Sequence, residues 1–218
     1  MTEALPEAEK KKRKESRETR RVQLIEATIR VLADEGYSRT TLTRVAQAAG
    51  LSHGLVNFHF SSKEGLLAET LTYLAEEYRD NWVSALEAAR GGTAERLHAL
   101  LLADFEPRIC TPDRLSAWCS YWGEAQSRPL YQENCSSNDE EYGRVLEDLC
   151  ARLAEEGGYE HDPTIVARVL RVTIEGVWLD MMTMRTPYER DEALVTVMTC
   201  AAAFFPRHFT RRGSLRTE

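Results

Sequence analysis

A run of hydrogen-bonding side chains, residues 38–67, has the spacing of two short helices. Thr41 can cap a first helix, Gly50 can take the left-handed backbone conformation that ends it, and Ser52 can cap a second one. The residues facing outward would be Thr43, Arg44, Gln47, His53, Gly54, Leu55, Asn57 and Phe58. Two short helices joined around a glycine form a helix-turn-helix, whose second helix enters the major groove of DNA. The expected chemistry is therefore hydrogen bonding to nucleic acid.

Two longer helices must hold this pair in place. Apolar residues at helical spacing predict a first helix from about Ser16 to Glu35, which Gly36 ends. A capping sequence at residues 61–64 predicts a long helix over about 62–89 with apolar residues along one side. Residues 16–68 should therefore form a three-helix DNA-binding domain, which the long helix joins to the rest of the chain.

A recurrent family pattern runs through the same stretch in fixed register. It is carried by Thr41, Val45, Ala46, Gly50, Ser52, Gly54, Val56, His59, Phe60, Lys63, Glu64, Leu66 and Leu67. The stretch resembles the DNA-binding domain of the TetR family of transcriptional regulators. Matching positions imply that phosphates are contacted by Thr41, Ser52, His59 and Lys63. Base edges would be read by Thr43, Arg44, His53, Gly54, Leu55 and Asn57. Asn57 and Phe58 stand where the family often has tyrosines, which leaves the individual base assignments open.

Charge is distributed unevenly along the chain. The net charge of −7 taken alone argues against a nucleic-acid partner. Residues 10–21, however, hold eight Lys or Arg against two Glu, a local charge of +6 at the start of the predicted DNA-binding domain. Because a duplex needs a basic surface only where it lies, this distribution favours DNA. Residues 1–15 are expected to form a disordered basic arm, which either reaches along the phosphates or is inert.

The remaining chain, residues 69–211, is expected to form an all-α effector-binding and dimerisation domain. Gly91–Gly92, Gly157–Gly158 and Pro187 separate the predicted helices, which brings the whole chain to about nine. The last two are apolar over more of their circumference than the outer layer of a monomer needs. In the resembled family these helices form a four-helix bundle with a second copy, which implies a homodimer on a palindromic operator. Packing within one chain is the alternative.

Aromatic residues gather in two places in this domain. Trp118, Tyr121 and Trp122 share one predicted helix, and a later run, 174–179, holds Glu175 and Trp178. These runs resemble the C-terminal domain of the BetI-like branch of the family, whose namesake responds to choline. Aromatic rings with a carboxylate are the chemistry that binds a quaternary ammonium. A small-molecule effector site is expected to be lined by Trp82, Phe105, Trp118, Tyr121, Trp122, Glu175, Trp178 and Met181.

Three alternatives stay open for the C-terminal domain. The effector could be an uncharged lipophilic metabolite, as for a regulator of an efflux or catabolic operon. The aromatic residues could be core with no ligand, since tryptophans at helical spacing often are. The chain could also be a helical adaptor that binds another protein and has only nonspecific affinity for DNA.

Several function classes lack the residues they require. Five scattered histidines, with no nucleophile elbow, phosphate loop or H-E-x-x-H motif, predict no catalytic site. Five widely spaced cysteines predict reduced thiols and no metal site, and no cofactor is expected. No run approaches the ~18 apolar residues of a membrane span, and the first residues lack the apolar stretch of a signal peptide. A cytoplasmic protein is expected.

Overall fold

The computed structural model describes residues 7–124, 128–187 and 189–215, with side chains from residue 16 onward. The N-terminal part, which we call the head, holds α1 (Glu7–Glu35), α2 (Leu42–Ala49), α3 (His53–His59) and the start of α4 (Lys63–Ala88). The C-terminal part, which we call the body, holds α5 (Thr93–Ala103), α6 (Pro112–Gly123), α7 (Arg128–Gly157), α8 (Pro163–Thr183) and α9 (Arg190–Phe204). The predicted all-α class and about nine helices are confirmed over this part of the chain.

The turn between α2 and α3 forms as its capping residues predict. The Thr41 hydroxyl accepts a hydrogen bond from the Arg44 N–H at 3.2 Å, and Ser52 does the same for the Leu55 N–H at 3.3 Å. Gly50 ends α2 with φ of 64°, a conformation that side chains with a Cβ rarely adopt. These local interactions fix the angle between the two helices and therefore the direction of the outer face of α3.

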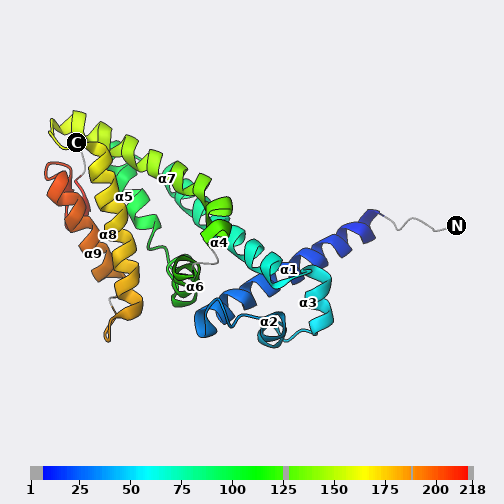
Figure 1. The fold of residues 1–218 in the computed structure, drawn as a ribbon. Coiled ribbons are helices and arrows are strands. Elements are labelled where there is room, and N and C mark those ends of the chain that lie inside the picture. The colour runs from blue at the N-terminus through cyan, green and yellow to red at the C-terminus, as the bar shows by residue number, and fades with distance from the viewer. Residues whose placement is uncertain (1–6, 125–127, 188, 216–218) are drawn as a thin grey trace.

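The first helix begins earlier than predicted. Residues 7–15, expected as part of a disordered arm, continue α1 as a helix that projects beyond α3 (Figure 1). The physical reason is composition, because residues 7–15 consist of Ala, Glu, Lys and Arg, which have high helix propensity. Residues 1–6 of the expected arm lie outside the described residues.

Two hydrophobic cores share α4. The head core contains Leu24, Ile29, Leu32, Val45, Val56, Phe60, Leu66, Leu71 and Leu74, and also Ala117, Trp118 and Tyr121 of α6. The body core contains Trp82, Leu97, Phe105, Leu146, Leu153, Leu170, Val177, Val197 and Phe205. The head core thus extends past the expected limit at residue 68, because α6 packs along α1 and covers its apolar side.

The C-terminal helices lie beside the head as a layered body (Figure 1). In this view α6 is seen end-on between α8 and the end of α1, while α8 and α9 form the outer edge. A short antiparallel pair, β1 (Phe209–Thr210) and β2 (Gly213–Ser214), follows α9 at the end of a domain that was expected to be all-α. None of the helices in the described ranges combines the length and apolarity that a membrane span requires.

Candidate DNA-reading face and effector cavity

Most residues expected to contact DNA lie on the surface of α2, α3 and their caps. Exposed are Thr41, Thr43, Arg44, Ser52, His53, Gly54, Asn57 and Phe58, whereas Leu55, His59 and Lys63 are half-buried. Val56 is fully buried and anchors α3 in the head core, so the opposite side of this helix faces outward. Exposed hydroxyl, amide, imidazole and guanidinium groups are the donors and acceptors that phosphate oxygens and base edges require.

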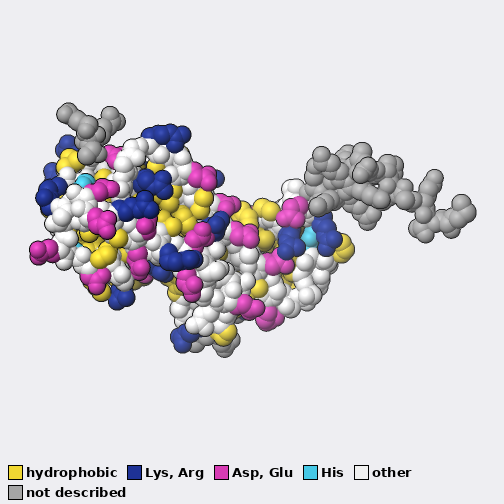
Figure 2. Space-filling view, turned by 90° about the horizontal axis from the view of Figure 1, so that it is seen from above, with side chains coloured by type: hydrophobic (Ala, Val, Ile, Leu, Met, Phe, Trp, Pro, Cys, Tyr) yellow, Lys and Arg dark blue, Asp and Glu magenta, His cyan; other side chains and the backbone are white. Residues whose placement is uncertain are grey.

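Side chains on α3 form a preordered polar surface. The Asn57 amide nitrogen lies 3.0 Å from Nδ1 of His53, one helical turn earlier. Phe58 is 66% exposed, and the Arg17 guanidinium lies 5.5 Å from its ring centroid, which adds a cation beside α3. Burial lowers the pKa of His59, and the nearby Arg17 and Arg21 lower it further. Figure 2 shows a histidine flanked by Lys or Arg side chains at this end of the molecule.

Lys63 has a role within the head that its sequence position had not indicated. Its ammonium donates to the carbonyl oxygens of Tyr37 at 3.1 Å and Ser38 at 3.0 Å, and lies 5.6 Å from the Tyr37 ring centroid. An ammonium has three N–H donors, so one is left for a phosphate. Lys63 therefore joins the start of α4 to the loop before α2.

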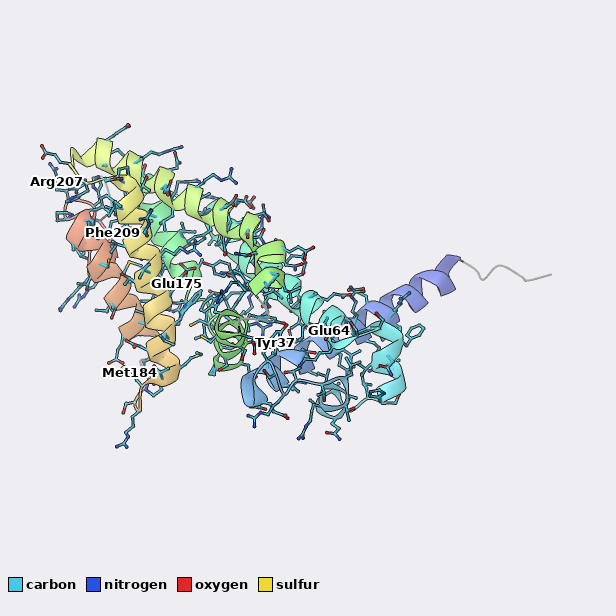
Figure 3. All side chains as sticks on the ribbon, in the orientation of Figure 1. Tyr37, Glu64, Glu175, Met184, Arg207 and Phe209 are labelled. Carbon is cyan, nitrogen blue, oxygen red and sulfur yellow. The ribbon has the colours of Figure 1, made fainter. Side chains whose placement is uncertain are left out.

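A cavity of about 530 Å³ opens among α4, α6, α7 and α8. It is lined by Tyr78, Trp118, Cys119, Trp122, Tyr131, Asp139, Tyr142, Arg171, Val172, Ile174, Glu175, Gly176, Trp178 and Leu179. Its volume and apolar walls with a few polar groups are typical of a small-molecule site. Figure 3 shows Glu175 on the inner side of α8, toward the interior of the body.

Aromatic rings form one wall of the cavity. Trp118 and Trp122 are stacked, with centroids 6.1 Å apart and planes inclined by 25°. Tyr131 of α7 meets Trp118 edge to face at 6.2 Å. The negative faces of such rings attract a cation, and their apolar surface also suits an apolar group, so this wall can hold either kind of ligand.

A charged group of three side chains also lines the cavity. Nε of Arg171 donates to Glu175 Oε1 at 2.9 Å, and an Arg171 Nη2 atom lies 3.8 Å from Asp139 Oδ2. The Tyr131 hydroxyl donates to the same Asp139 oxygen at 3.0 Å. Burial raises the pKa of Asp139, while Arg171 and Tyr131 act in the opposite direction. With both acids ionised, this group carries one more negative than positive charge.

A buried carboxyl supports the inner end of the cavity. Asp104 is fully buried and accepts hydrogen bonds from the hydroxyls of Tyr78 at 2.6 Å and Tyr142 at 2.7 Å. Its backbone carbonyl accepts the Trp178 indole N–H at 3.2 Å. Burial raises the pKa of Asp104 to about 7, against the two tyrosine hydrogen bonds, which lower it. Asp104 thus fixes three of the lining rings without lining the cavity itself.

Four of the eight residues expected at the effector site line the cavity: Trp118, Trp122, Glu175 and Trp178. The other four, Trp82, Phe105, Tyr121 and Met181, do not line this cavity. Trp82 and Phe105 are buried in the body core, and Met181 packs against that core near Cys110. Tyr121 points toward the head, where its hydroxyl donates to the Leu67 carbonyl at 2.8 Å. The reason is helix geometry: Trp122 lies about 40° around α6 to one side of Trp118 and Tyr121 about 60° to the other side, so Tyr121 and Trp122 point about 100° apart.

Five polar or aromatic lining residues had not been expected there: Tyr78, Tyr131, Asp139, Tyr142 and Arg171. The sequence held one usable signal, the spacing of Arg171 and Glu175, which are four residues apart on a helix with an apolar inner side. Asp139 gave no such signal, since its pairing with Arg171 depends on how α7 packs against α8.

Helix α6 connects the cavity to the head. Trp118 and Trp122 line the cavity, while Ser120 donates to the Leu32 carbonyl of α1 at 3.2 Å. Figure 3 shows Tyr37 on the side of the head that is next to α6, where its ring meets Tyr121 edge to face at 5.7 Å. A change in the position of α6 would therefore reach both α1 and the start of α4.

Arg114, at the start of α6, adds an ionic connection. Its guanidinium donates to both carboxylate oxygens of Glu77 on α4, at 2.7 and 2.9 Å, and to Glu26 on α1 at 2.9 Å. The Arg114 side chain is only 15% exposed, and these bonds raise its pKa. Glu26 also accepts from the Tyr73 hydroxyl at 3.1 Å. Three helices are thus tied together at one guanidinium.

Two family models match the chain. One, described as bacterial regulatory proteins of the tetR family, matches residues 24–70, and the other, described as the C-terminal domain of BetI-type transcriptional repressors, matches residues 93–206. Two proteins named HTH-type transcriptional regulator BetI are similar over most of their length. That of Paraburkholderia phymatum is 31% identical over 193 residues, with 82% of this chain and 89% of the relative covered. That of Burkholderia thailandensis is 31% identical over 185 residues, with the same coverage.

Solved structures agree with this relationship. A protein from Pseudomonas aeruginosa PAO1, described as a transcriptional regulator, has a TM-score of 0.71 and 29% identity, covering 85% of this chain and 88% of that one. A regulator from Saccharomonospora viridis, solved in complex with choline, shares the fold with a TM-score of 0.66 and 22% identity, covering 81% and 92%. These relatives are regulators and not enzymes. The chain belongs to the tetR family of bacterial transcriptional regulators, and its C-terminal domain is of the BetI type.

Proposed function

We propose that this regulator is a repressor that binds a palindromic operator as a homodimer and leaves it when a small organic cation, such as choline, enters the cavity. The observation that carries the proposal is the cavity itself, in which an aromatic wall lies beside two carboxylates and a single guanidinium. Rings of this kind attract a desolvated cation with up to ~2 kcal/mol each. The surplus of one negative charge adds to that attraction.

The similar proteins support this choice of effector. Relatives are named BetI, one matching family model is described as a repressor, and the regulator from Saccharomonospora viridis was solved with choline. The same aromatic wall would also suit an uncharged lipophilic effector, since Val172, Ile174 and Leu179 are apolar. The acidic pair favours the cation, because two carboxylates share one guanidinium and a neutral ligand would not offset the remaining negative charge.

Homodimerisation is proposed through α8 and α9. Exposed apolar residues on α8 are Ile165, Val169, Val172 and Leu179, and Val195 is exposed on α9. The α8 residues, with Gly176, repeat at alternating spacings of four and three, which makes one continuous stripe along a helix. Such a stripe is suited to a bundle with a second copy, and two copies would present two α3 helices to successive major grooves.

The proposed release mechanism runs through α6. A ligand stacked against Trp118 and Trp122 would move that helix, and α6 is bonded to α1 and α4 through Arg114, Ser120 and Tyr121. Tilting α4 changes the distance between the two heads of a dimer. The effector must prefer the resulting spacing, because a ligand with equal affinity for both states shifts no population.

Fluorescence anisotropy tests the proposal directly. A duplex that carries the operator, found by footprinting upstream of the regulator's own gene, is titrated with protein in the presence and absence of choline chloride. We expect operator affinity to fall about tenfold or more with choline, within the usual range of allosteric coupling. Unchanged operator affinity across millimolar choline would refute the cation proposal, and release by a neutral lipophilic compound instead would support the second candidate effector.

A further inference from the structure

The two carboxylates of the cavity are already paired with a positively charged side chain of the protein itself. Arg171 lies between Glu175, one turn later on α8, and Asp139 on α7. The Asp139 carboxylate in turn accepts from Tyr131, whose ring packs on Trp118. The two acids therefore stand beside the aromatic wall, where a bound organic cation would need them.

Arg171 is placed to leave this position. Its side chain is 39% exposed, so its guanidinium can move into water without being stranded in the core. A long flexible stem permits this movement while the backbone of α8 stays in place. The contact to Asp139 is also long for an ion pair, 3.8 Å, and has no hydrogen-bond geometry like that to Glu175.

We propose that Arg171 is an internal counter-ion that competes with the effector cation for Asp139 and Glu175, so that residue 171 sets which cations the cavity accepts. This inference rests on the proposed function and deepens it. Displacing the guanidinium costs the free energy of its contacts. Only cations that also gain free energy from contact with the aromatic wall therefore bind well. A simple ammonium or alkali cation lacks the large apolar surface that this wall rewards.

Displacing Arg171 has a second consequence for the fold. The guanidinium connects α7 to α8, and residue 172 belongs to the exposed apolar stripe of α8. An effector that takes over Asp139 and Glu175 therefore replaces one connection between α7 and α8 next to the proposed dimer face. The exchange of Arg171 for the effector cation therefore changes the contacts of both α7 and α8.

Calorimetry with a charged and an uncharged ligand of equal shape tests the inference. The variants are Arg171→Met, which keeps the stem and removes the charge, and Arg171→Lys, which keeps the charge. Arg168→Met is the matched control, since Arg168 is an exposed arginine on the same helix and does not line the cavity. The ligands are choline and 3,3-dimethyl-1-butanol, which replaces the quaternary nitrogen by carbon.

We expect Arg171→Met to bind choline about tenfold more tightly than the wild type. Its affinity for 3,3-dimethyl-1-butanol should change less than about twofold, because no charge is exchanged there. Arg171→Lys and Arg168→Met should bind choline like the wild type. Circular dichroism melting of each variant shows whether it is folded at the titration temperature.

Each other outcome decides the matter. Equal or weaker choline binding by Arg171→Met would overturn the inference and leave the proposed effector standing. Tighter binding of both ligands would assign the effect to the bulk of Arg171, not its charge, and would also overturn it. Choline binding by Arg171→Met alone would support the inference and reject choline as the wild-type effector. If neither the wild type nor any variant bound choline, both proposals would be overturned.

Discussion

Among the side chains expected to meet DNA, some also hold the head together. Asn57 is exposed and its amide is oriented by His53, whereas Lys63 bonds two carbonyls of the loop before α2. An amide held in this way can form hydrogen bonds with both edge atoms of an adenine and so distinguish it from the other bases. A phosphate contact is the same at every base. Replacing each of these two residues by alanine should therefore affect DNA binding differently.

Asn57→Ala should lower affinity for the operator by about 1–3 kcal/mol while leaving affinity for a random duplex unchanged. Lys63→Ala should weaken binding to both duplexes by similar factors. It should also lower the melting temperature of the protein, because the Tyr37 and Ser38 carbonyls lose their donor. Anisotropy with both duplexes at one salt concentration measures the ratio. Equal losses on the two duplexes for Asn57→Ala would contradict its role in base recognition.

The buried Asp104 carboxyl should make stability depend on pH. Its pKa is about 7 in the folded protein and near 3.8 in the unfolded chain, so the folded state binds more protons between these values. The free energy of unfolding should therefore fall as pH rises from about 4 through 7, by on the order of 4 kcal/mol from this group. Asp104→Asn, which stays neutral, should flatten that dependence when melting temperatures are compared from pH 5 to 8.

The control for Asp104 is Asp113→Asn, which changes an exposed carboxyl in the first turn of α6. Its melting curve should keep the wild-type pH dependence. If Asp104→Asn and the wild type showed parallel dependences, the carboxyl would have to be ionised throughout, stabilised by Tyr78 and Tyr142.

At the scale of elements, α6 is both a wall of the cavity and a support of the head. Arg114→Met should remove its ionic connections to Glu26 and Glu77 and lower the free energy of unfolding by about 2–3 kcal/mol, since two carboxylates then lose a largely buried partner. Operator binding without effector should persist, because the α3 face is unchanged. The fall in operator affinity on adding choline should shrink.

A surface pair gives the comparison for Arg114. Arg152→Met removes an exposed ion pair with Asp148 on α7, which is worth little. Thermal melting and operator titrations with and without choline measure both effects. A full effector response in Arg114→Met would show that Ser120 and Tyr121 suffice to couple α6 to the head.

The elements differ in how far the sequence predicted them. Thr41, Gly50 and Ser52 act within a few residues of themselves, so the helix-turn-helix could be located from local patterns. The cavity could be predicted only in part, because Trp82 and Trp118 share the same apolar character, and packing decides which one meets open space. Arg171 and Asp139 come together only after α7 and α8 have packed, which no local pattern records.

At the scale of the whole molecule, the proposed recognition of a palindromic operator depends on a second copy. One α3 offers seven residues, too short a helix to select an operator from a genome by itself. A two-fold pair doubles the contacts and fixes their spacing. The exposed apolar stripe on α8 is the surface that this arrangement would bury.

Val169→Glu should separate the dimer, because it places a charge in the middle of that stripe, where burial without a partner is costly. Light scattering after gel filtration should report one chain in place of two, and operator affinity should fall by at least about a hundredfold while random-duplex affinity changes little. Leu215→Glu is the control, since Leu215 is similarly exposed but lies after β2, away from α8. A Val169→Glu protein that remained a dimer would exclude this face of α8 from the interface, and a wild-type protein that was a single chain at micromolar concentration would remove the basis for a two-fold operator.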